Sequence, residues 1–338
     1  MNSFGRLFRI SIFGESHGES VGIVVDGCPA GMPLTVEDFL PDLERRKGGT
    51  QKGTTPRQEE DLPIFKSGLF NNKTTGAPIT ILFENKNIRS GDYEKQRDVP
   101  RPGHADFVAH KKFGGFEDYR GSGHFSGRLT VALVAAGVIA KKILNLGPEL
   151  AVGVASSILE IGGERDLDKG LQRAIEAKDS IGGIIECRAT GLPIGLGEPF
   201  FDSAESLLSH IVFAIPAVRG IEFGTGFPAS KMFGSEHNDA IENMEGKTTT
   251  NHAGGVVGGL TNGNELVFRI AIKPTSSTPK EQITLNWETG KVESASVKGR
   301  HDLCIALRVP VILEAVTAIV LADLVLLEQK IQRVSTKR

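Results

Sequence analysis

The sequence contains little cysteine, tryptophan and tyrosine. Its 338 residues include three cysteines, one tryptophan and two tyrosines. Cys28, Cys187 and Cys304 are far apart and form no C-x-x-C pair. An odd number of cysteines without metal-ligand spacing favours reduced thiols in a cytosolic protein over a disulfide framework. We therefore expect three buried, inert thiols and a cytoplasmic location.

An excess of charge of either sign is also absent. The 39 lysines and arginines nearly balance the 41 aspartates and glutamates, which leaves a net charge of −2. A domain that binds nucleic acid usually has an overall basic surface, so this balance argues against such a partner. Any basic site must be local. The hydrophobic content of 39% and the charged content of 24% are those of an ordinary soluble protein.

Several familiar motifs are missing as well. Residues 1–16 have too short an apolar run for a signal peptide and contain no cleavage pattern. The sequence has no Rossmann G-x-G-x-x-G, no P-loop, no G-x-S-x-G elbow, and no acidic pair or H-x-x-x-H helix that would suggest a metal. The longest apolar run, residues 309–327, contains Glu314 and Asp323, so we expect a buried helix rather than a membrane span.

Glycine, in contrast, is abundant, and residues 101–137 combine it with basic side chains. In this stretch several cations alternate with glycines before the chain turns into an apolar helix; they are Arg101, His104, Lys111, Lys112, Arg120, His124 and Arg128. Glycine lets the backbone approach a ligand closely, while arginine and histidine donate hydrogen bonds to phosphate or carboxylate oxygens. The stretch is therefore typical of an anion-binding site.

Four further clusters share this character. They are GESHG at 14–18, the basic segment 45–57, KPTSS at 273–277 and GRHD at 299–302. Together with residues 101–137 they supply more cations than one phosphate needs, which implies either one ligand with several anionic groups or two ligands side by side. Histidines among them favour acid–base chemistry near neutral pH.

Hydrophobic periodicity predicts both strands and helices. The expected strands are residues 7–13, 21–25, 62–67, 79–84, 152–159, 183–187 and 266–272. The expected helices begin after Thr35, at 128 (to 144), at 167 (to 177), near 202 and near 310. Pro41 should kink the first of these helices. Residues 48–61 form either a surface loop or a mobile lid that brings Lys52 and Arg57 over an anionic ligand.

The order of these elements predicts one α+β layered domain over residues 1–338. A loose similarity between residues 22–33 and 183–193 favours an internal duplication of a β-turn-α unit.

Seven motifs, taken in order, resemble the chorismate synthase family. They are GESHG (14–18), RPGHAD (101–106), YRGSGHFSGR (119–128) running on to AAG (135–137), GLGEP (195–199), NHAGG (251–255), KPTSS (273–277) and GRHD (299–302). The match extends from Phe4 to about Asp323. The resemblance implies a lyase of the shikimate pathway that uses reduced FMN to convert 5-enolpyruvylshikimate 3-phosphate into chorismate and phosphate by 1,4-elimination. It also implies a β-α-β sandwich of antiparallel sheets around helices, assembled as a homotetramer.

The resemblance further assigns roles to individual positions. His17 would protonate the departing phosphate, His104 would protonate the reduced flavin near N1, and Asp302 would help to move the flavin N5 proton. The residues that would hold substrate anions are Arg46, Lys52, Arg57, Arg101 and Arg128. The residues that would contact FMN are His124, Phe125, Ser126, Ala217, Gly258, Lys273, Pro274, Thr275, Ser276, Ser277 and Arg300, the last of them shared with the substrate.

The sequence departs from the family pattern at some of these positions. His124 stands where many members have arginine, Lys52 replaces a usual arginine, and Leu303 replaces a proline. A lysine offers a point charge instead of a bidentate fork. We expect the reaction to be retained, with the contacts of positions 52 and 124 left open.

Two other interpretations remain at this stage. One is a flavin- or nucleotide-binding module without catalysis, which would need neither His17 nor His104. The other is a bifunctional enzyme that also reduces its flavin with NADPH, and so binds NADP. We expect no additional domain, and the sequence contains no Rossmann motif. We therefore favour the monofunctional enzyme, which depends on an external flavin reductant.

Overall fold

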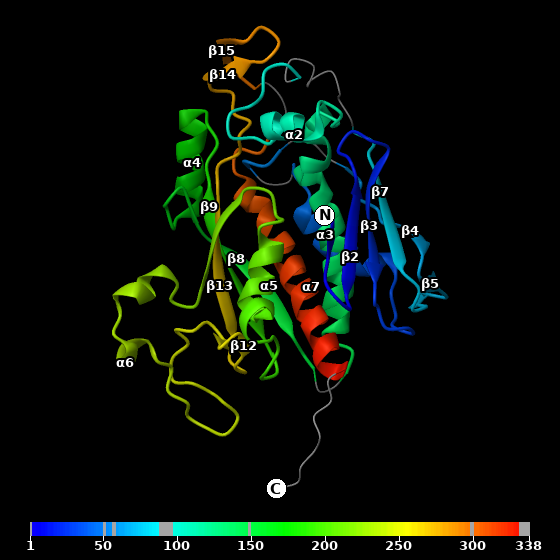
Figure 1. Ribbon diagram of the computed structural model, residues 1–338, viewed down its shortest axis with the longest axis vertical. Helices are drawn as coiled ribbons and strands as arrows, with labels where there is room; N and C mark the ends of the chain where they lie inside the picture. Colours follow the sequence, from blue (N-terminus) through cyan, green and yellow to red (C-terminus); the bar gives the residue numbers. More distant parts are fainter. Residues whose placement is uncertain are drawn as a thin grey trace.

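Two antiparallel sheets enclose a layer of helices in the computed structural model, which describes residues 2–49, 52–55, 59–87, 97–147, 150–297 and 301–330 (Figure 1). The first sheet has the strand order β1 (Ser3–Phe4), β2 (Arg9–Gly14), β3 (Ser20–Asp26), β7 (Ile79–Glu84) and β4 (Ile64–Ser67). The second has the order β10 (Val218–Phe223), β13 (Leu266–Ile272), β9 (Gly183–Thr190) and β8 (Gly153–Ile161). This architecture confirms the predicted α+β sandwich.

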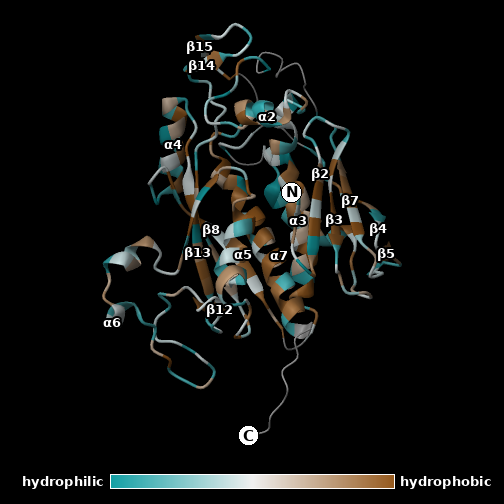
Figure 2. Cartoon of the chain, viewed as in Figure 1, coloured by the Kyte–Doolittle hydropathy of each residue, from teal (hydrophilic) through white to brown (hydrophobic). Residues whose placement is uncertain are grey.

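The helical layer consists mainly of α3 (Thr130–Ile143), α7 (Val309–Lys330), α5 (Ala204–Val212) and α1 (Leu40–Arg46). Helix α3 packs on β2, β3 and β7, whereas α7 packs on β8 and β9, and the two helices pack against each other. At their crossing a Cβ on Gly137 would lie 2.3 Å from Ala315 Cβ, so only glycine permits this approach. Figure 2 shows hydrophobic residues concentrated along this central layer. The core therefore lies between the sheets.

The apolar helix α7 carries two acidic residues that are buried but fully engaged. Asp323 accepts hydrogen bonds from the backbone N–H groups of Arg6, Leu7 and Phe8 at 2.7–2.9 Å. Glu314 accepts two hydrogen bonds from Arg45, both 2.7 Å long. The segments Arg120–Ile143 and Ile305–Glu328 are long and apolar enough to cross a membrane, yet 78% and 89% of their apolar windows are buried inside the protein. This burial confirms the prediction of a buried helix at 309–327.

The three cysteines are free and buried. Burial raises the pKa of each thiol to about 11. Few of these thiols ionise near neutral pH, which agrees with the expected inert cysteines.

The first predicted helix is wrong in one respect. Pro41 does not kink a continuous helix. Instead, a 3-10 turn, η1 (Val36–Asp38), ends before α1, and Pro41 occupies the first turn of α1. A first-turn residue has no intrahelical partner for its N–H, so proline is accommodated there without a kink. Thr35 N donates to Asp38 Oδ2 at 2.8 Å, a capping contact at the start of η1.

Some elements were not predicted. Helix α2 (Asp106–Phe113) interrupts the glycine-rich stretch, and only Ala109 of it is buried, so it has no apolar stripe that periodicity could detect. The hairpin of β14 (Gln282–Asn286) and β15 (Lys291–Ala295) has mostly exposed residues. Helix α4 (Leu167–Ala177) was predicted with these bounds. The short elements not yet named are β5 (Leu69–Phe70), β6 (Lys73–Thr74), η3 (Arg120–Phe125), η4 (Gly127–Leu129), η5 (Phe200–Asp202), η6 (Phe227–Lys231), α6 (Gly234–His237), β11 (Val256–Val257), β12 (Leu260–Thr261) and η7 (Ile305–Arg308).

The two similar segments of the sequence fall in different sheets. Residues 22–33 include most of β3 in the first sheet, and residues 183–193 include β9 in the second. Both strands lie inside their sheets, between two neighbours. The internal duplication and the single-domain assignment stay predictions.

Candidate active site

A cavity of about 250 Å³ lies at the N-terminal ends of α3 and α7. We call it the anion cavity. Its walls come from five parts of the chain that are far apart in sequence, namely residues 46–48 with 55, 59 and 61, then residues from 101–130, 215–217, 273–277 and 301–312. Because two helices begin at this wall, their N–H ends favour a negatively charged ligand.

Most of the predicted site residues line the anion cavity. They are Arg46, Arg101, His104, Phe125, Ser126, Arg128, Ala217, Lys273, Pro274, Thr275, Ser276, Ser277 and Asp302. Four of the other predicted residues lie outside this wall, namely Lys52, Gly258, His17 and His124, the last two of which are described below. Lys52 Nζ is 3.4 Å from Gln172 Oε1 of α4, and Gly258 forms the turn between β11 and β12. Arg57 and Arg300 lie outside the described residues.

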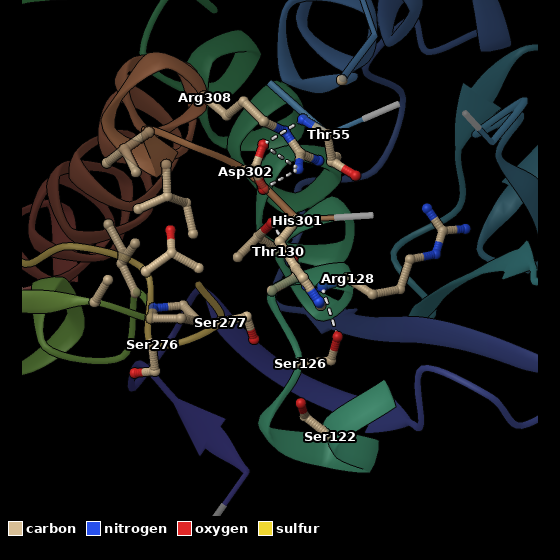
Figure 3. A pocket seen from close by; sticks show the side chains of 18 of the residues that line it. Thr55, Ser122, Ser126, Arg128, Thr130, Ser276, Ser277, His301, Asp302 and Arg308 are labelled. Carbon is tan, nitrogen blue, oxygen red and sulfur yellow. Dashed lines mark hydrogen bonds and ion pairs between the residues drawn. The ribbon is translucent and has the colours of Figure 1, made fainter. Parts of the chain in front are cut away.

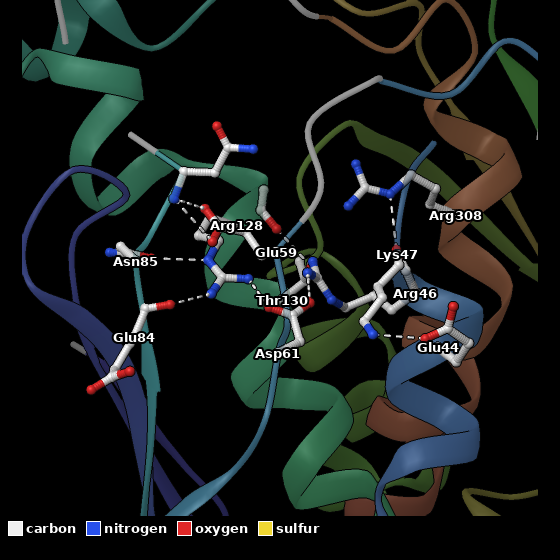
Figure 4. A network of polar contacts seen from close by, with 12 residues as sticks. Glu44, Arg46, Lys47, Glu59, Asp61, Glu84, Asn85, Arg128, Thr130 and Arg308 are labelled. Atoms are coloured by element: carbon white, nitrogen blue, oxygen red, sulfur yellow. Dashed lines mark hydrogen bonds and ion pairs between the residues drawn. The ribbon is translucent and has the colours of Figure 1, made fainter. Parts of the chain in front are cut away.

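One wall of the anion cavity is a cluster of two arginines around Asp61 (Figure 4). Arg46 Nη2 donates to Asp61 Oδ2 at 2.7 Å, and Arg128 Nη1 donates to Asp61 Oδ1. Arg128 also donates to Asn85 Oδ1 at 3.0 Å and to the Glu84 carbonyl at 3.2 Å. The two guanidinium groups and one carboxylate leave one excess positive charge, which suits a ligand anion.

Asp61 is ionised in spite of its burial. Its side chain is 0% exposed. Burial alone would raise the pKa of Asp61, but Coulombic attraction from Arg46 and Arg128 outweighs burial and holds this pKa below its usual range. Burial lowers the pKa of Arg128, and the Asp61 carboxylate opposes this effect. The cluster is therefore a fixed arrangement of charges at the cavity wall.

A second cluster joins Arg101, His104, Asp106 and Ser122. Arg101 Nε donates to Asp106 Oδ2 at 2.7 Å, and Arg101 Nη2 donates to Asp106 Oδ1 at 2.8 Å. His104 Nδ1 lies 2.6 Å from Asp106 Oδ1, and His104 Nε2 lies 3.3 Å from Ser122 Oγ. Arg101 Nη1 also donates to Ser277 Oγ at 3.0 Å. Each of the three guanidinium nitrogens of Arg101 thus donates to a group within the protein.

The predicted catalytic carboxylate, Asp302, is held by an arginine of the next 3-10 turn (Figure 3). Arg308 Nη1 donates to Asp302 Oδ2 at 3.0 Å, and Thr55 N donates to Asp302 Oδ1 at 2.9 Å. Arg308 Nε donates to the Arg46 carbonyl at 3.0 Å. Burial lowers the pKa of Arg308, with Asp302 acting in the opposite sense. These bonds connect the GRHD motif to the basic segment after α1.

The KPTSS motif is connected to RPGHAD across the cavity. Lys273 Nζ donates to the Gly103 carbonyl at 2.7 Å and to Ser276 Oγ at 2.8 Å. Burial lowers the pKa of Lys273, and the charge of Arg219 lowers it further. The motif therefore presents one ammonium group and several hydroxyls to the cavity.

His17 does not line the anion cavity but lies directly behind its wall. It is 5% exposed. Gly121 lines the cavity, and a Cβ on this glycine would lie 2.0 Å from His17 Nδ1. Gly121 also has a φ of +57°, a conformation that L side chains rarely adopt. Because residue 121 is glycine, only the backbone of this residue lies between His17 and the cavity.

A second space, of about 740 Å³, adjoins the anion cavity. We call it the apolar cavity, because Phe4, Ile10, Ile12, Leu129, Leu133 and Ile211 form much of its wall. It shares His104, Phe125, Ser126, Thr130, Pro216, Ala217 and Lys273 with the anion cavity. His124 faces this second space, with Nδ1 2.8 Å from the Gly14 carbonyl and Nε2 3.1 Å from Asn2 Oδ1. Two adjoining spaces agree with the expectation of two ligands.

Arg46 Nε and Thr275 Oγ1 belong to residues of the anion cavity wall. Both atoms are buried without a hydrogen bond among the residues that the structure describes. Buried polar atoms in native proteins are nearly always satisfied. A bound ligand with anionic oxygens would supply the missing acceptors.

Sequence reasoning did not single out Asp61, Asp106 or Arg308. A signal existed for Asp106, since a carboxylate two residues after a histidine in RPGHAD could have been read as its partner. Arg308 directly precedes the apolar helix, which could have indicated a cation at the helix N-terminal wall. Nothing in the local sequence of Asp61 indicates that it lies between two distant arginines.

The fold and the site together define a class of protein. It is an α+β sandwich that gathers cations, a histidine and a carboxylate around a deep cavity for anionic ligands, with an apolar space beside it. This combination is typical of an enzyme acting on a polyanionic substrate together with a second, partly apolar ligand.

Comparison with known proteins identifies the family. The model of the family described as chorismate synthase matches residues 8–326. A chorismate synthase of Chitinophaga pinensis is 71% identical over 334 residues, covering 99% of each chain. One of Dehalococcoides mccartyi is 44% identical, covering 98% of this chain and 99% of the relative. A crystal structure of chorismate synthase shares the fold with a TM-score of 0.72 at 24% identity, covering 96% of this chain and 93% of the other.

The chain therefore belongs to the chorismate synthase family. Members of this family are lyases of the shikimate pathway, and their reaction eliminates phosphate from 5-enolpyruvylshikimate 3-phosphate to form chorismate.

Proposed function

We propose that this elimination takes place in the anion cavity, with reduced FMN bound in the adjoining apolar cavity. The observation that carries the proposal is the junction of the two spaces, where His104, Ser126 and Lys273 line both. The substrate has a phosphate and two carboxylates, and the cofactor brings another phosphate. Two cationic clusters and a lysine with neighbouring hydroxyls fit that number of anionic groups.

Arg46 and Arg128 are proposed to hold a substrate anion. Asp61 fixes both guanidinium groups but neutralises only one of them, so one positive charge is left for the ligand. Arg46 Nε, buried without a partner in the described part of the chain, is a free donor for this purpose. Hydrogen bonds between a guanidinium and an anionic oxygen are among the strongest in proteins.

The residues of the apolar cavity and of KPTSS fit a flavin. The apolar wall suits a planar ring system, while Lys273 and the hydroxyl of Thr275 suit a phosphate. Lys273 and Thr275 would hold the cofactor phosphate, and reduced flavin bound there would supply an electron donor that is regenerated in each turnover, since the elimination involves no net redox change. The lowered pKa of Lys273 has a burial cause, which an anionic phosphate nearby would reverse.

Three residues are proposed to handle protons. His17, behind Gly121, would protonate the departing phosphate, and His104, at the junction of the cavities, would serve as the acid beside the flavin. Asp302, held by Arg308 and Thr55, would accept a proton within the anion cavity. Each role needs a proton donor or acceptor that is held in a fixed position.

The protein is further proposed to act as a homotetramer in the cytoplasm, with reduced flavin supplied by an external reductant. Four phenylalanines are 76–91% exposed, namely Phe200, Phe201, Phe227 and Phe233. Monomeric proteins rarely expose large apolar patches, so these side chains fit contacts between subunits. Phe227 and Phe233 lie next to α6, in a segment that extends away from the sandwich (Figure 1). Light scattering coupled to size-exclusion chromatography measures the assembly.

An anaerobic assay with 5-enolpyruvylshikimate 3-phosphate, FMN and dithionite tests the proposed function. We expect phosphate and chorismate to appear in equal amounts, and neither to form without dithionite. Absence of both products from the folded protein, beside an active positive control, would refute the proposal. Unchanged flavin affinity in His17→Ala together with no product from the parent protein would instead indicate a binding module. Turnover in air with NADPH as the sole reductant would indicate the bifunctional enzyme.

A further inference from the structure

We propose that Asp106 is a positioning residue for His104, and that Arg101 locks Asp106 in place instead of binding a substrate anion. This inference rests on the proposed function, since it concerns how His104 is prepared for its role. Asp106 was not among the expected site residues. Arg101 was among them, but as a residue that binds a substrate anion.

Asp106 determines which ring nitrogen of His104 carries the proton. His104 Nδ1 lies 2.6 Å from Asp106 Oδ1. Arg101 Nη2 also lies 3.1 Å from Nδ1, but the contact with Asp106 is the shorter one, and an ionised carboxylate only accepts hydrogen bonds, so we infer that Nδ1 carries a proton. Burial would raise the pKa of Asp106, but hydrogen bonds from Arg101 and His104 outweigh burial and hold this pKa far below its usual range. Asp106 thus remains ionised throughout the neutral range and selects one tautomer of the ring.

Arg101 fixes the orientation of the Asp106 carboxylate. Arg101 donates to both carboxylate oxygens through Nε and Nη2, and the Arg101 backbone N–H donates to Oδ2 at 3.1 Å. The side chains of Arg101 and Asp106 are only 5% and 13% exposed, so water competes little for these bonds. A bidentate pair of this kind fixes direction as well as distance. The guanidinium of Arg101 is therefore committed to the protein.

Ser122 contacts the other nitrogen of the His104 imidazole, Nε2. Arg101 Nη2 donates to Ser122 Oγ at 2.8 Å, and Ser122 Oγ lies 3.3 Å from His104 Nε2. Because the hydroxyl oxygen accepts from Arg101, its own proton is available to the lone pair of Nε2. A closed ring of hydrogen bonds thus runs from Arg101 through Ser122, His104 and Asp106 back to Arg101. These hydrogen bonds hold His104 in the wall shared by the two cavities.

The charges around His104 come from several elements. Asp106 is at the start of α2, and Arg101 precedes it in the same segment. Lys273, after β13, bonds the carbonyl of the neighbouring Gly103. A third space, of about 420 Å³, is lined by His104 together with Arg97, Asp98, His110, Glu117, Asp118 and Glu288. Among these groups, Asp106 is the carboxylate within hydrogen-bond distance of the His104 ring.

The test compares Asp106→Asn with the unchanged protein. In ¹⁵N-histidine spectra, with the His104 signals assigned by their loss in His104→Gln, we expect the unchanged protein to show the Nδ1–H tautomer and Asp106→Asn to show a mixture of both. We expect kcat to fall about 10-fold or more and KM to change less than about 2-fold, because positioning acts on the proton and not on substrate binding. Glu117→Gln, which alters another histidine–carboxylate pair of this region at His110, should leave kcat within about 2-fold.

A second variant tests Arg101 without depending on the first. Arg101→Lys keeps the positive charge but cannot form the bidentate pair with Asp106. We therefore expect a lower kcat at nearly constant KM. A KM raised about 10-fold or more at constant kcat would mean that Arg101 binds substrate, and would overturn its part of the proposal.

The outcomes separate the two proposals. An Nε2–H tautomer in the unchanged protein, or an unaltered tautomer and kcat in Asp106→Asn, would overturn the inference about Asp106 while chorismate formation still supported the proposed function. No chorismate from the unchanged protein would sink the proposed function, whereas the ¹⁵N spectra would still report the tautomer of His104.

Discussion

Two aspartate–arginine clusters face the same cavity, and they differ in their second partner. Asp61 lies between two arginines, which never lose their charge, whereas Asp106 lies between one arginine and one histidine. The first cluster keeps one excess positive charge at every pH near neutrality. The second has balanced charge until His104 takes up a proton. The comparison suggests that similar components serve two purposes, holding an anion in one cluster and holding a proton in the other.

The largest expected effect comes from removing the permanent charge. Arg128→Leu should lower kcat/KM by about 100-fold, mostly through a higher KM, because a buried charged hydrogen bond to a ligand is lost. Steady-state kinetics under anaerobic conditions measures this change. Arg188→Leu removes an arginine that pairs with Glu186 on the second sheet, outside the cavity, and should have almost no kinetic effect. A mainly lower kcat in Arg128→Leu would show that the two clusters do not differ as proposed.

An intermediate effect is expected when the carboxylate of the first cluster is neutralised. Asp61→Asn leaves two buried guanidinium groups without compensation, so the free energy of unfolding should fall by about 3 kcal/mol. Asparagine tolerates the left-handed backbone of this position, where φ is +53°, so backbone strain should not add to the loss. Denaturant unfolding at pH 7 measures the difference.

The same variant predicts a pH dependence. The folded-state pKa of Asp61 lies below its unfolded value, so the stabilisation by this carboxylate is complete above about pH 4 and is lost as the pH falls further. The difference in unfolding free energy between the unchanged protein and Asp61→Asn should therefore shrink in acid. A difference that stays constant from pH 7 to pH 3 would contradict the assigned ion pairs.

The smallest expected effect belongs to the hydroxyl of the second cluster. Ser122→Ala removes one hydrogen bond to His104 Nε2 and should lower kcat about 5-fold, which corresponds to about 1 kcal/mol. Ser122 has a φ of +70°, so Ser122→Gly removes the same hydroxyl while relieving the backbone. Equal kcat values in both variants would assign the loss to the hydroxyl. A loss in Ser122→Ala that glycine restores would assign it to the backbone instead.

The sequence by itself determined the elements whose residues repeat with a clear period. Three elements have the predicted bounds: the strands at 79–84 and 266–272 and the helix at 167–177. Their apolar residues follow the period of a strand or a helix, which can be recognised from neighbouring residues alone. The seven motifs, each a run of adjacent residues, indicated the family and the anion-binding character. Helix α2 and the β14–β15 hairpin escaped prediction, since exposed elements carry no apolar stripe.

Only the tertiary structure decided which side chains are partners. Asp61 meets Arg128 across 67 residues of sequence, and Arg308 meets the Arg46 carbonyl across 262. Such contacts depend on how α3 and α7 pack between the two sheets, which no local pattern encodes. The packing moved His17 behind Gly121 and drew Arg101 into an internal network. The sequence determined which chemical groups are available, and the folded chain decided which of them are left for a ligand, because hydrogen-bonding capacity used within the protein is lost to the site.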